Sequence, residues 1–418
     1  MQPRERSEAS PARFIPAGTS LAPGDERELA EIVADHAARK VPLWSEGGGT
    51  KRHHGPAAPL TAQHLSMRRL GRITAHDPGD QVVSVQAGAR LTDVQRILAQ
   101  HRQWLPLDPP YAGATIGGIL AAASAGPRRL GYGTIKDYLL GARVAGVHGG
   151  ITQSGGRVVK NVTGYDLHRL QVGAFGSLGI LLEAHLKVTT RPPVTAALLV
   201  GFAGFSEAVV FLLGIWDKAI RPVALEALDA EAATSLRALT PELPTAGAVA
   251  VVGLEGGRAL VERQVRAIRQ HQDGVGTPAV LLEGAASERL WLAFRDAPTR
   301  AAGHMIARVG VRPHDLPDLL PILAPDLPAG TACSCQAGTG LLRLRLPAAL
   351  EAERALEPLR RCGEAAAALG GYLVMESAPQ GLAGRERLPW GTGSSGLARR
   401  LKEAWDPHGI LNPGRMAL

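Results

Sequence analysis

The sequence of 418 residues has very few cysteines. Cys333, Cys335 and Cys362 are too few for a disulfide framework in a chain of this length, which suggests a reducing compartment. Cys333 and Cys335 form a C-x-C pair without a second Cys or His pair at metal-ligand spacing, so we expect them to be small core residues of a strand. The sequence also lacks the closely spaced cysteine run of iron–sulfur proteins, and we expect no cluster in this chain.

Aromatic residues are also scarce, at 4% of the sequence, which disfavours the stacking of bases on aromatic side chains. The formal net charge of +8 favours anionic partners. The basic residues are dispersed, however, and form no block longer than a doublet such as Arg128 and Arg129. We therefore expect a solvated basic surface with local anion sites and no nucleic acid partner.

Long apolar runs without charge are missing as well. The most apolar window, residues 197–216, carries Glu207 in its middle, and Ser206 suits the N-cap of a helix. We expect a strand followed by a helix there rather than a membrane span. Residues 1–14 are charged and have no apolar core, so we expect no signal peptide. These features predict a cytoplasmic protein with at most peripheral contact with the inner face of the cell membrane.

Glycine and proline, in contrast, are abundant, and the pattern changes at Pro192 and Pro193. Before these prolines, short strands alternate with glycine-rich loops, and helices are expected at residues 23–40, 92–101 and 119–125. After them, longer elements predict an α+β arrangement around a mostly antiparallel sheet. We expect strands at residues 197–202, 248–254, 279–283, 305–311, 341–346 and 372–376, and helices at residues 206–216, 258–271, 316–323 and 349–369.

Three glycine-rich segments precede the double proline. In residues 45–51 (SEGGGTK), consecutive glycines allow successive backbone N–H groups to surround an anion such as a pyrophosphate, although Glu46 directly before them would repel it. The segment matches neither a Walker loop nor a dinucleotide-binding fingerprint. Residues 114–118 (ATIGG) and 132–137 (YGTIKD) again place small residues where a flat or extended ligand could lie. Because all three segments fall between strands of one predicted domain, they favour a cofactor site over simple loop packing.

These segments, together with residues 155–180 and the terminal LKEAWDPHGILNPGRM, resemble the FAD-linked oxidases of the vanillyl-alcohol-oxidase/PCMH-type flavin fold. Among them, the chain is most similar to the FAD-binding subunits of bacterial glycolate oxidases (glycolate dehydrogenases). The resemblance implies an α+β protein with a PCMH-type FAD-binding fold of two α/β subdomains and an α+β cap domain with an antiparallel sheet. The implied domains are a polar N-terminal extension (1–20), the FAD-binding domain (21–193), the cap domain (194–385) and a C-terminal tail that returns to the FAD-binding domain (386–418).

The resemblance also implies a set of cofactor-binding residues. We expect the pyrophosphate to be held by Gly47, Gly48, Gly49 and Thr50. The flavin and its linker would be lined by Thr115, Ile116, Gly117 and Gly118, and the adenosine end would lie near Tyr132, Gly133 and Asp137. The backbone of Gly179 and Ile180 would contact the cofactor, and Asn412 would fold back toward the isoalloxazine. Thr50 stands where covalently attached members have His, which implies non-covalent FAD. The nearby His53 and His54 are expected to be solvent-exposed loop residues.

Within residues 155–180, the remaining side chains are expected to support the loop. Leu167, Leu170 and Val172 would pack behind the cofactor, and Lys160, Asn161 and Asp166 would fix the loop. The same stretch contains Phe175 where the catalytic relatives have an acid.

A second departure concerns catalysis. Catalytic 2-hydroxyacid members carry a His-rich strand motif with Gly-Asp-Gly that supplies metal ligands and a general base. At the equivalent place this sequence reads CQAGTGLLRLRLP, without His or Asp, so we expect no metal site and the sequence identifies no catalytic residue. Arg343 and Arg345, at i and i+2 of a strand, would share one face and could bind a substrate carboxylate. A solvated basic face of the strand is the alternative, and general strand statistics favour it.

The resemblance implies an FAD-binding subunit of a glycolate oxidase complex. It would oxidise glycolate, a small 2-hydroxy acid, to the 2-oxo acid and pass electrons through FAD to an iron–sulfur partner, beside a catalytic flavoprotein subunit. Two alternatives remain open. One is a stand-alone FAD-dependent 2-hydroxyacid dehydrogenase that uses Lys160, Arg343 and Arg345, and the other is a scaffold subunit whose FAD does not turn over.

Overall fold

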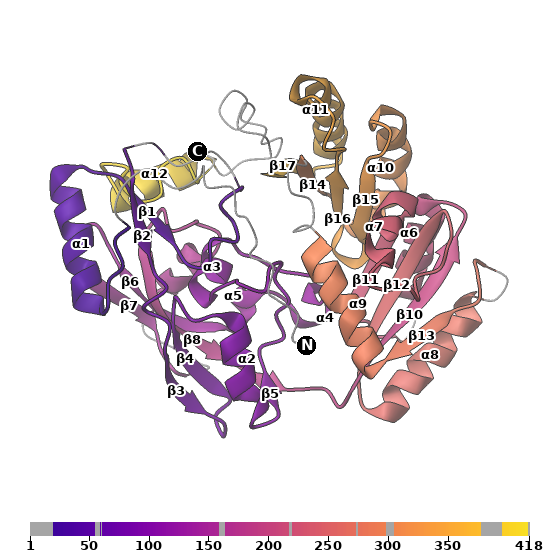
Figure 1. Ribbon diagram of the computed structural model, residues 1–418, viewed down its shortest axis with the longest axis horizontal. Coiled ribbons are helices and arrows are strands. Elements are labelled where there is room, and N and C mark those ends of the chain that lie inside the picture. The colour runs from indigo at the N-terminus through magenta and orange to yellow at the C-terminus, as the bar shows by residue number, and fades with distance from the viewer. Residues whose placement is uncertain are drawn as a thin grey trace, which may run out of the picture.

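The computed structural model describes residues 20–54, 59, 61–158, 164–216, 220–272, 275–297, 305–377 and 395–416. Figure 1 shows two bodies side by side, one formed by the N-terminal part of the chain and the other by the elements from β10 (Val194–Phe202) onward. Helix α12 (Ser395–Trp405), drawn in yellow, lies against the N-terminal body. The end of the chain thus returns to the body in which the chain begins.

The N-terminal body contains a five-stranded antiparallel sheet with the order β3-β4-β8-β6-β7. Its strands are β3 (Ile73–Asp77), β4 (Val82–Gln86), β8 (Ile180–Lys187), β6 (Leu139–Ala145) and β7 (Ile151–Gly155). Two smaller sheets pair β1 (Leu43–Glu46) with β2 (Gln63–Ser66) and β5 (Gln103–Trp104) with β9 (Thr189–Thr190). The helices are α1 (Glu26–Arg39), α2 (Leu91–Ala99), α3 (Ile116–Ala121), α4 (Arg129–Tyr132), α5 (Ile135–Tyr138) and the 3₁₀ helix η2 (Leu167–Gln171).

The tail docks on this body through buried apolar residues. Ile410 and Leu411 are each 1% exposed and belong to the same core as Leu29, Leu43 and Leu65. The Leu43 N–H donates to the Ile410 carbonyl at 2.8 Å, so the tail also extends the hydrogen bonding of β1. Each fully buried leucine contributes about 1.5–3 kcal/mol of transfer free energy, which holds the tail beside the loop that follows β1.

The second body contains an eight-stranded antiparallel sheet with the order β13-β10-β12-β11-β15-β16-β14-β17. Besides β10, its strands are β11 (Ala224–Asp229), β12 (Ala248–Gly256), β13 (Val280–Glu283), β14 (Ile306–Gly310), β15 (Ala332–Gln336), β16 (Leu341–Arg345) and β17 (Tyr372–Ser377). Its α-helices are α6 (Phe205–Trp216), α7 (Ala230–Arg237), α8 (Arg258–Gln272), α9 (Gly284–Asp296), α10 (Leu316–Leu323) and α11 (Ala352–Ala368), and its 3₁₀ helices are η4 (Pro313–Asp315), η5 (Ala324–Asp326) and η6 (Ala337–Thr339). The antiparallel cap sheet predicted from the sequence is confirmed.

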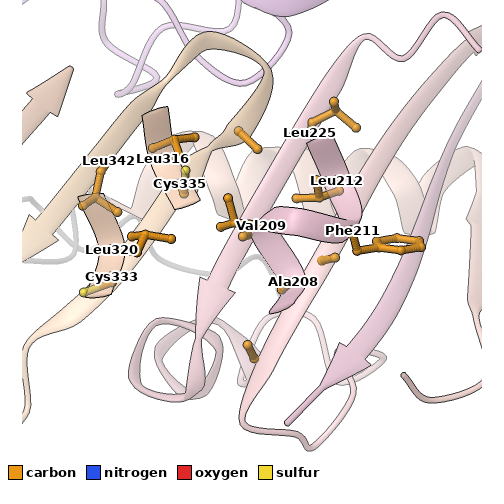
Figure 2. Close-up of a cluster of buried hydrophobic side chains, with 14 of the residues drawn as sticks. Ala208, Val209, Phe211, Leu212, Leu225, Leu316, Leu320, Cys333, Cys335 and Leu342 are labelled. Carbon is orange, nitrogen blue, oxygen red and sulfur yellow. The ribbon is translucent and has the colours of Figure 1, made fainter. Parts of the chain in front are cut away.

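Figure 2 shows part of the core of this body, where the side chains of α6 and α10 meet those of the sheet. Cys333 and Cys335 of β15 lie among these apolar side chains. Both are buried free thiols, and burial raises the pKa of each. Their predicted role as small core residues of a strand is confirmed.

The apolar window at residues 197–216 contains most of β10 and all of α6, so the predicted strand followed by a helix is confirmed. Helix α6 begins at Phe205, so Ser206 lies inside its first turn and the N-cap predicted there was wrong. No helix in the described part of the chain is both long and apolar enough to cross a membrane.

A buried polar network joins the two bodies. Arg128 donates from Nε to Oε1 of Glu255 at 2.8 Å, and the Tyr132 hydroxyl donates to Oε2 of the same carboxylate at 2.6 Å. The Arg128 backbone N–H donates to Asp108 at 3.0 Å. The Glu255 side chain is only 1% exposed, so its charge depends on Arg128 for compensation.

Candidate functional site

A cleft of about 790 Å³, including its open mouth, lies in the N-terminal body. It opens where the loop after β1, the start of α3, the loop before β8 and the C-terminal tail meet. Of the cofactor-binding residues predicted from the sequence, those that line it are Gly47, Gly48, Gly49, Thr50, Thr115, Gly117, Gly118, Ile180 and Asn412. The structure thus brings together segments that are far apart in the sequence, the most distant being residues 47 and 412.

The glycine loop at residues 47–50 presents hydrogen-bond donors to the cleft. Within the described residues, the backbone N–H groups of this loop have no acceptor. Its carbonyls are held from another side, because Arg68 donates to the Gly47 and Gly48 oxygens at 3.2 and 3.4 Å. Unpaired N–H groups in consecutive residues are suited to bind the oxygens of an anionic ligand.

This loop packs too closely on the segment before α3 for side chains to fit. A Cβ atom on Gly47 would overlap Oγ1 of Thr115, and one on Gly48 would overlap the carbonyl oxygen of Gly113. Gly49 has φ +76°, which L side chains rarely adopt. The three glycines are therefore a steric requirement of this contact.

Glu46 does not present an uncompensated charge to the cleft. It forms an ion pair with Arg52, and its Oε1 lies 3.5 Å from Nε2 of His64. Burial by itself would raise the Glu46 pKa, but the hydrogen bonds from Arg52 and the nearby His64 ring outweigh it and bring the pKa to about 2. The expected repulsion between Glu46 and a phosphate is thus reduced by Arg52.

Lowering the pH is expected to remove this stabilisation. The folded-state pKa of Glu46 is about 2, below its ordinary value of 4.5, so its contribution is present above pH 4.5 and is lost as the pH falls toward 2. Between pH 6 and pH 3 the wild type should lose about 2 kcal/mol more unfolding free energy than Glu46→Gln. Urea unfolding at several pH values measures this difference, and parallel pH profiles for the two proteins would contradict it.

Thr115 and Gly117 shape the wall of the cleft that faces the glycine loop. Thr115 is the N-cap of α3, and its Oγ1 accepts from the Gly118 N–H at 3.2 Å. A Cβ on Gly117 would come within 2.7 Å of the Ala87 Cβ, so glycine allows α3 to lie directly on the end of β4. Ile116 points the other way and is fully buried in the core.

Asn412 ties the tail to two walls of the cleft. Its Oδ1 accepts from the Ser45 N–H at 2.7 Å, and its Nδ2 donates to the Phe175 carbonyl at 2.5 Å. Phe175 lines the cleft with φ +51°, an uncommon conformation that this hydrogen bond helps to hold. Arg415 follows, with its guanidinium 4.3 Å from the Trp44 ring centre, and burial lowers its pKa to about 10.

Five of the predicted residues lie outside the lining of this cleft. They are Ile116, Tyr132, Gly133, Asp137 and Gly179. The Tyr132 hydroxyl binds Glu255 of the second body, Asp137 accepts from the Thr134 N–H at 2.7 Å, and Gly179 is packed so closely on Val144 that a Cβ would overlap it. The predicted contacts of these residues with the cofactor stay predictions.

The supporting residues of the stretch 155–180 were only partly predicted. Leu167 and Leu170 are 46% and 37% exposed, so their predicted packing behind the cofactor was wrong. The short helix η2 turns these two side chains outward and buries His168 instead. Asp166 pairs with Arg169 at 3.2 Å, whereas Lys160 and Asn161 lie outside the described residues.

A polar cluster lies between the cleft and the cap sheet. Nε2 of His53 is 2.9 Å from the Tyr111 hydroxyl, and Nζ of Lys51 is 5.2 Å from the Tyr111 ring centre. On the cap side, Glu376 of β17 forms ion pairs with Arg343 at 2.8 Å and Arg308 at 3.5 Å. We refer to these six residues as the junction cluster.

Electrostatics keep the histidine of the junction cluster neutral. Burial, followed by the charge of Lys51, lowers the His53 pKa to about 4. Burial also lowers the Lys51 pKa to about 8, although Glu376 opposes the shift. His53 and His54 are half-buried, so the prediction that they are solvent-exposed was wrong.

Other lining residues were not predicted. Lys51, Phe175, Gly176 and Arg415 lie inside motifs that the sequence already marked, and Arg52 directly follows one of them, so proximity to those motifs was an available signal. Met67, Ala87 and Leu181 carry no local signal, because backbone pairing with distant segments (Glu46, Leu182 and Val144, respectively) brings them to the cleft.

Comparison with known families identifies the architecture. Residues 19–155 match the model of an FAD binding domain, and residues 191–316 and 383–416 match the model of the FAD linked oxidases, C-terminal domain. The chain belongs to the FAD-linked oxidases. It is therefore an FAD-dependent oxidoreductase, and the unpaired donors of the glycine loop fit the pyrophosphate of that cofactor.

Individual relatives support this assignment. This FAD-linked oxidase is 39% identical to glycolate oxidase subunit GlcE of Escherichia coli, over 41% of this chain and 49% of GlcE. It is 28% identical to glycolate oxidase subunit GlcD of Bacillus subtilis, over 95% of this chain and 88% of GlcD. The crystal structure of p-cresol methylhydroxylase with substrate bound has the same fold, with a TM-score of 0.71 at 16% identity over 95% of this chain and 88% of that chain. The predicted fold is confirmed.

Proposed function

We propose that this FAD-linked oxidase is the FAD-binding subunit of a glycolate oxidase. The complex oxidises glycolate, or a related 2-hydroxy acid, to the 2-oxo acid. The observation that carries the proposal is the cleft with its unpaired N–H donors, in a chain similar to two glycolate oxidase subunits. When bound, FAD supplies a two-electron acceptor for the substrate.

The residues of the chain act by binding and orientation. The N–H groups of residues 47–50 hold the pyrophosphate, and Thr115, Gly117 and Gly118 line the flavin and its linker. Asn412 fixes the tail over the site, through its hydrogen bonds with Ser45 and Phe175. Thr50 provides no nucleophilic imidazole, so FAD stays non-covalent.

The electrons leave this chain for an iron–sulfur partner subunit. The sequence has only three cysteines, and all three are buried in the cap. No group of His, Cys, Asp or Glu in the described residues is arranged to hold a metal ion. A catalytic flavoprotein subunit completes the complex.

The division of the chain follows from this role. We place the FAD-binding domain at residues 21–193, the cap at 194–385 and the returning tail at 386–418. The start of β10 at Val194 and the contact of Ile410 and Leu411 with the N-terminal core support these boundaries.

A stand-alone 2-hydroxyacid dehydrogenase is the second candidate, and the junction cluster favours it. Neutral His53 can accept a proton at pH 7, and it is already hydrogen-bonded to the Tyr111 hydroxyl. Lys51 adds positive charge beside it, which suits a carboxylate substrate. In this mechanism the base comes from the FAD-binding domain instead of a cap strand.

Anaerobic reduction separates the candidates. We expect glycolate to leave the FAD of the isolated chain oxidised and to bleach it in the assembled complex, as followed by flavin absorbance. Bleaching of the isolated chain by glycolate or D-lactate would favour the stand-alone enzyme. A flavin that stays oxidised while the complex turns over would instead identify a scaffold subunit.

A further inference from the structure

A second cavity lies between the cap sheet and the segment 110–127 of the FAD-binding domain. It measures about 680 Å³ including its mouth, and it shares no lining residue with the FAD cleft. Its polar wall comes from three neighbouring strands of the cap sheet: Glu226 of β11, Ser334 and Gln336 of β15, and Arg343 and Arg345 of β16. The prediction that the two arginines share one face of a strand is confirmed.

Glu226 is an unsatisfied group in this wall. Glu226 is only 3% exposed, and its Oε1 has no hydrogen-bond partner within the described structure. Burial raises its pKa well above the ordinary value, although Arg343 opposes the shift. Burial therefore favours the protonated carboxyl group, which has a proton to donate.

Arg345 is the second unsatisfied group. The residue is half-buried, and its guanidinium group makes no hydrogen bond or ion pair with any residue that the structure describes. The other two arginines of the cavity are compensated, because Arg343 pairs with Glu376 and Arg295 donates to Asp296 at 2.8 and 2.6 Å. Among its described lining residues, the cavity thus contains one unpaired guanidinium, Arg345, and one buried carboxyl group with an unsatisfied oxygen, Glu226.

We propose that this cavity binds a small monoanionic carboxylic acid, with the Arg345 guanidinium on the carboxylate and the Glu226 carboxyl group on a neighbouring oxygen. A guanidinium binds a carboxylate through two parallel hydrogen bonds, and a single unpaired cation favours a single negative charge. The donor of Glu226 requires an acceptor beside the carboxylate, as in a 2-oxo or 2-hydroxy acid. This choice of acid class rests on the proposed function, whereas the site itself requires no FAD turnover.

Calorimetric titration of the FAD-loaded full chain with pyruvate tests the site. Pyruvate is a 2-oxo acid that cannot reduce the flavin, so the result is independent of whether the chain oxidises glycolate. Arg345→Gln should weaken binding at least about tenfold. The control is Arg354→Gln, which removes the same charge from a side chain that is 77% exposed on α11 and should bind pyruvate as the wild type does.

Two substitutions of Glu226 test the neutral carboxyl group. Glu226→Gln keeps an uncharged donor and should retain affinity within about threefold, whereas Glu226→Leu should lose at least about tenfold. Flavin content and melting temperature report whether each variant is folded. The proposal is overturned if the wild type binds no pyruvate at about 10 mM, or if Arg345→Gln binds pyruvate as the wild type does. It is also overturned if Glu226→Gln binds pyruvate more than about tenfold tighter than the wild type, as an ionised Glu226 would require.

Discussion

Gly48→Ala is expected to lower the FAD retained by the purified protein to less than about a tenth of the wild-type content. The added Cβ would overlap the carbonyl oxygen of Gly113, a backbone atom that no side-chain rotation can move. The glycine loop must then shift, and its N–H groups no longer converge on one anion. A displacement of this size removes several charge-assisted hydrogen bonds, each of about 1.5–3 kcal/mol. Flavin absorbance relative to protein absorbance measures the loss.

Gly150→Ala is the matched control for this substitution. Gly150 has no atom within 4 Å of the position of its Cβ and lies outside the cleft. This variant should retain a full complement of FAD. If Gly48→Ala also retains it, the glycine loop does not hold the pyrophosphate and the assignment of residues 47–50 fails.

Arg128→Met is expected to destabilise the protein by about 3–5 kcal/mol, because it leaves the buried Glu255 carboxylate without its cation. The same substitution removes the charge beside Asp108, which is itself buried. We expect the melting temperature to fall by at least about 5 °C. Differential scanning calorimetry measures the shift and shows whether the two bodies still unfold together.

Arg258→Met is the control, since it breaks an ion pair with Glu283 whose side chains are 58% and 39% exposed. Exposed pairs contribute about 0–1 kcal/mol, so the control should change the melting temperature little. Equal shifts for the two variants would contradict a structural role for the Arg128 network.

The elements of both bodies were largely predictable because their patterns are local. The periodic apolar positions of α8 and the strong apolar run of β12 predict a helix and a strand from sequence alone. The prediction overlooked β11, α7 and α9 in the cap. Strand β11 carries the polar Glu226 in a buried position, which conceals its strand character, and α7 is short and rich in alanine.

The glycine loop of the cleft was also predictable, because close backbone contacts and a positive φ angle require glycine at these positions, and the glycines are visible in the sequence. Contacts between the two bodies left no such signal. Tyr132 was expected near the cofactor, yet its hydroxyl binds Glu255, a residue 123 positions away in the sequence. His53 and His54 were expected in solvent for the same reason, since the cap residue Glu376 beside them is known only from the fold.

The most direct test of the account is the flavin content of the purified full chain after acid denaturation. The cleft, its unpaired N–H donors and Thr50 predict a yellow protein that releases about one FAD per chain into the supernatant, which corresponds to a fully occupied cleft. A colourless protein without releasable FAD would contradict the assignment of the cleft, and a flavin that stays with the precipitated chain would contradict the non-covalent site.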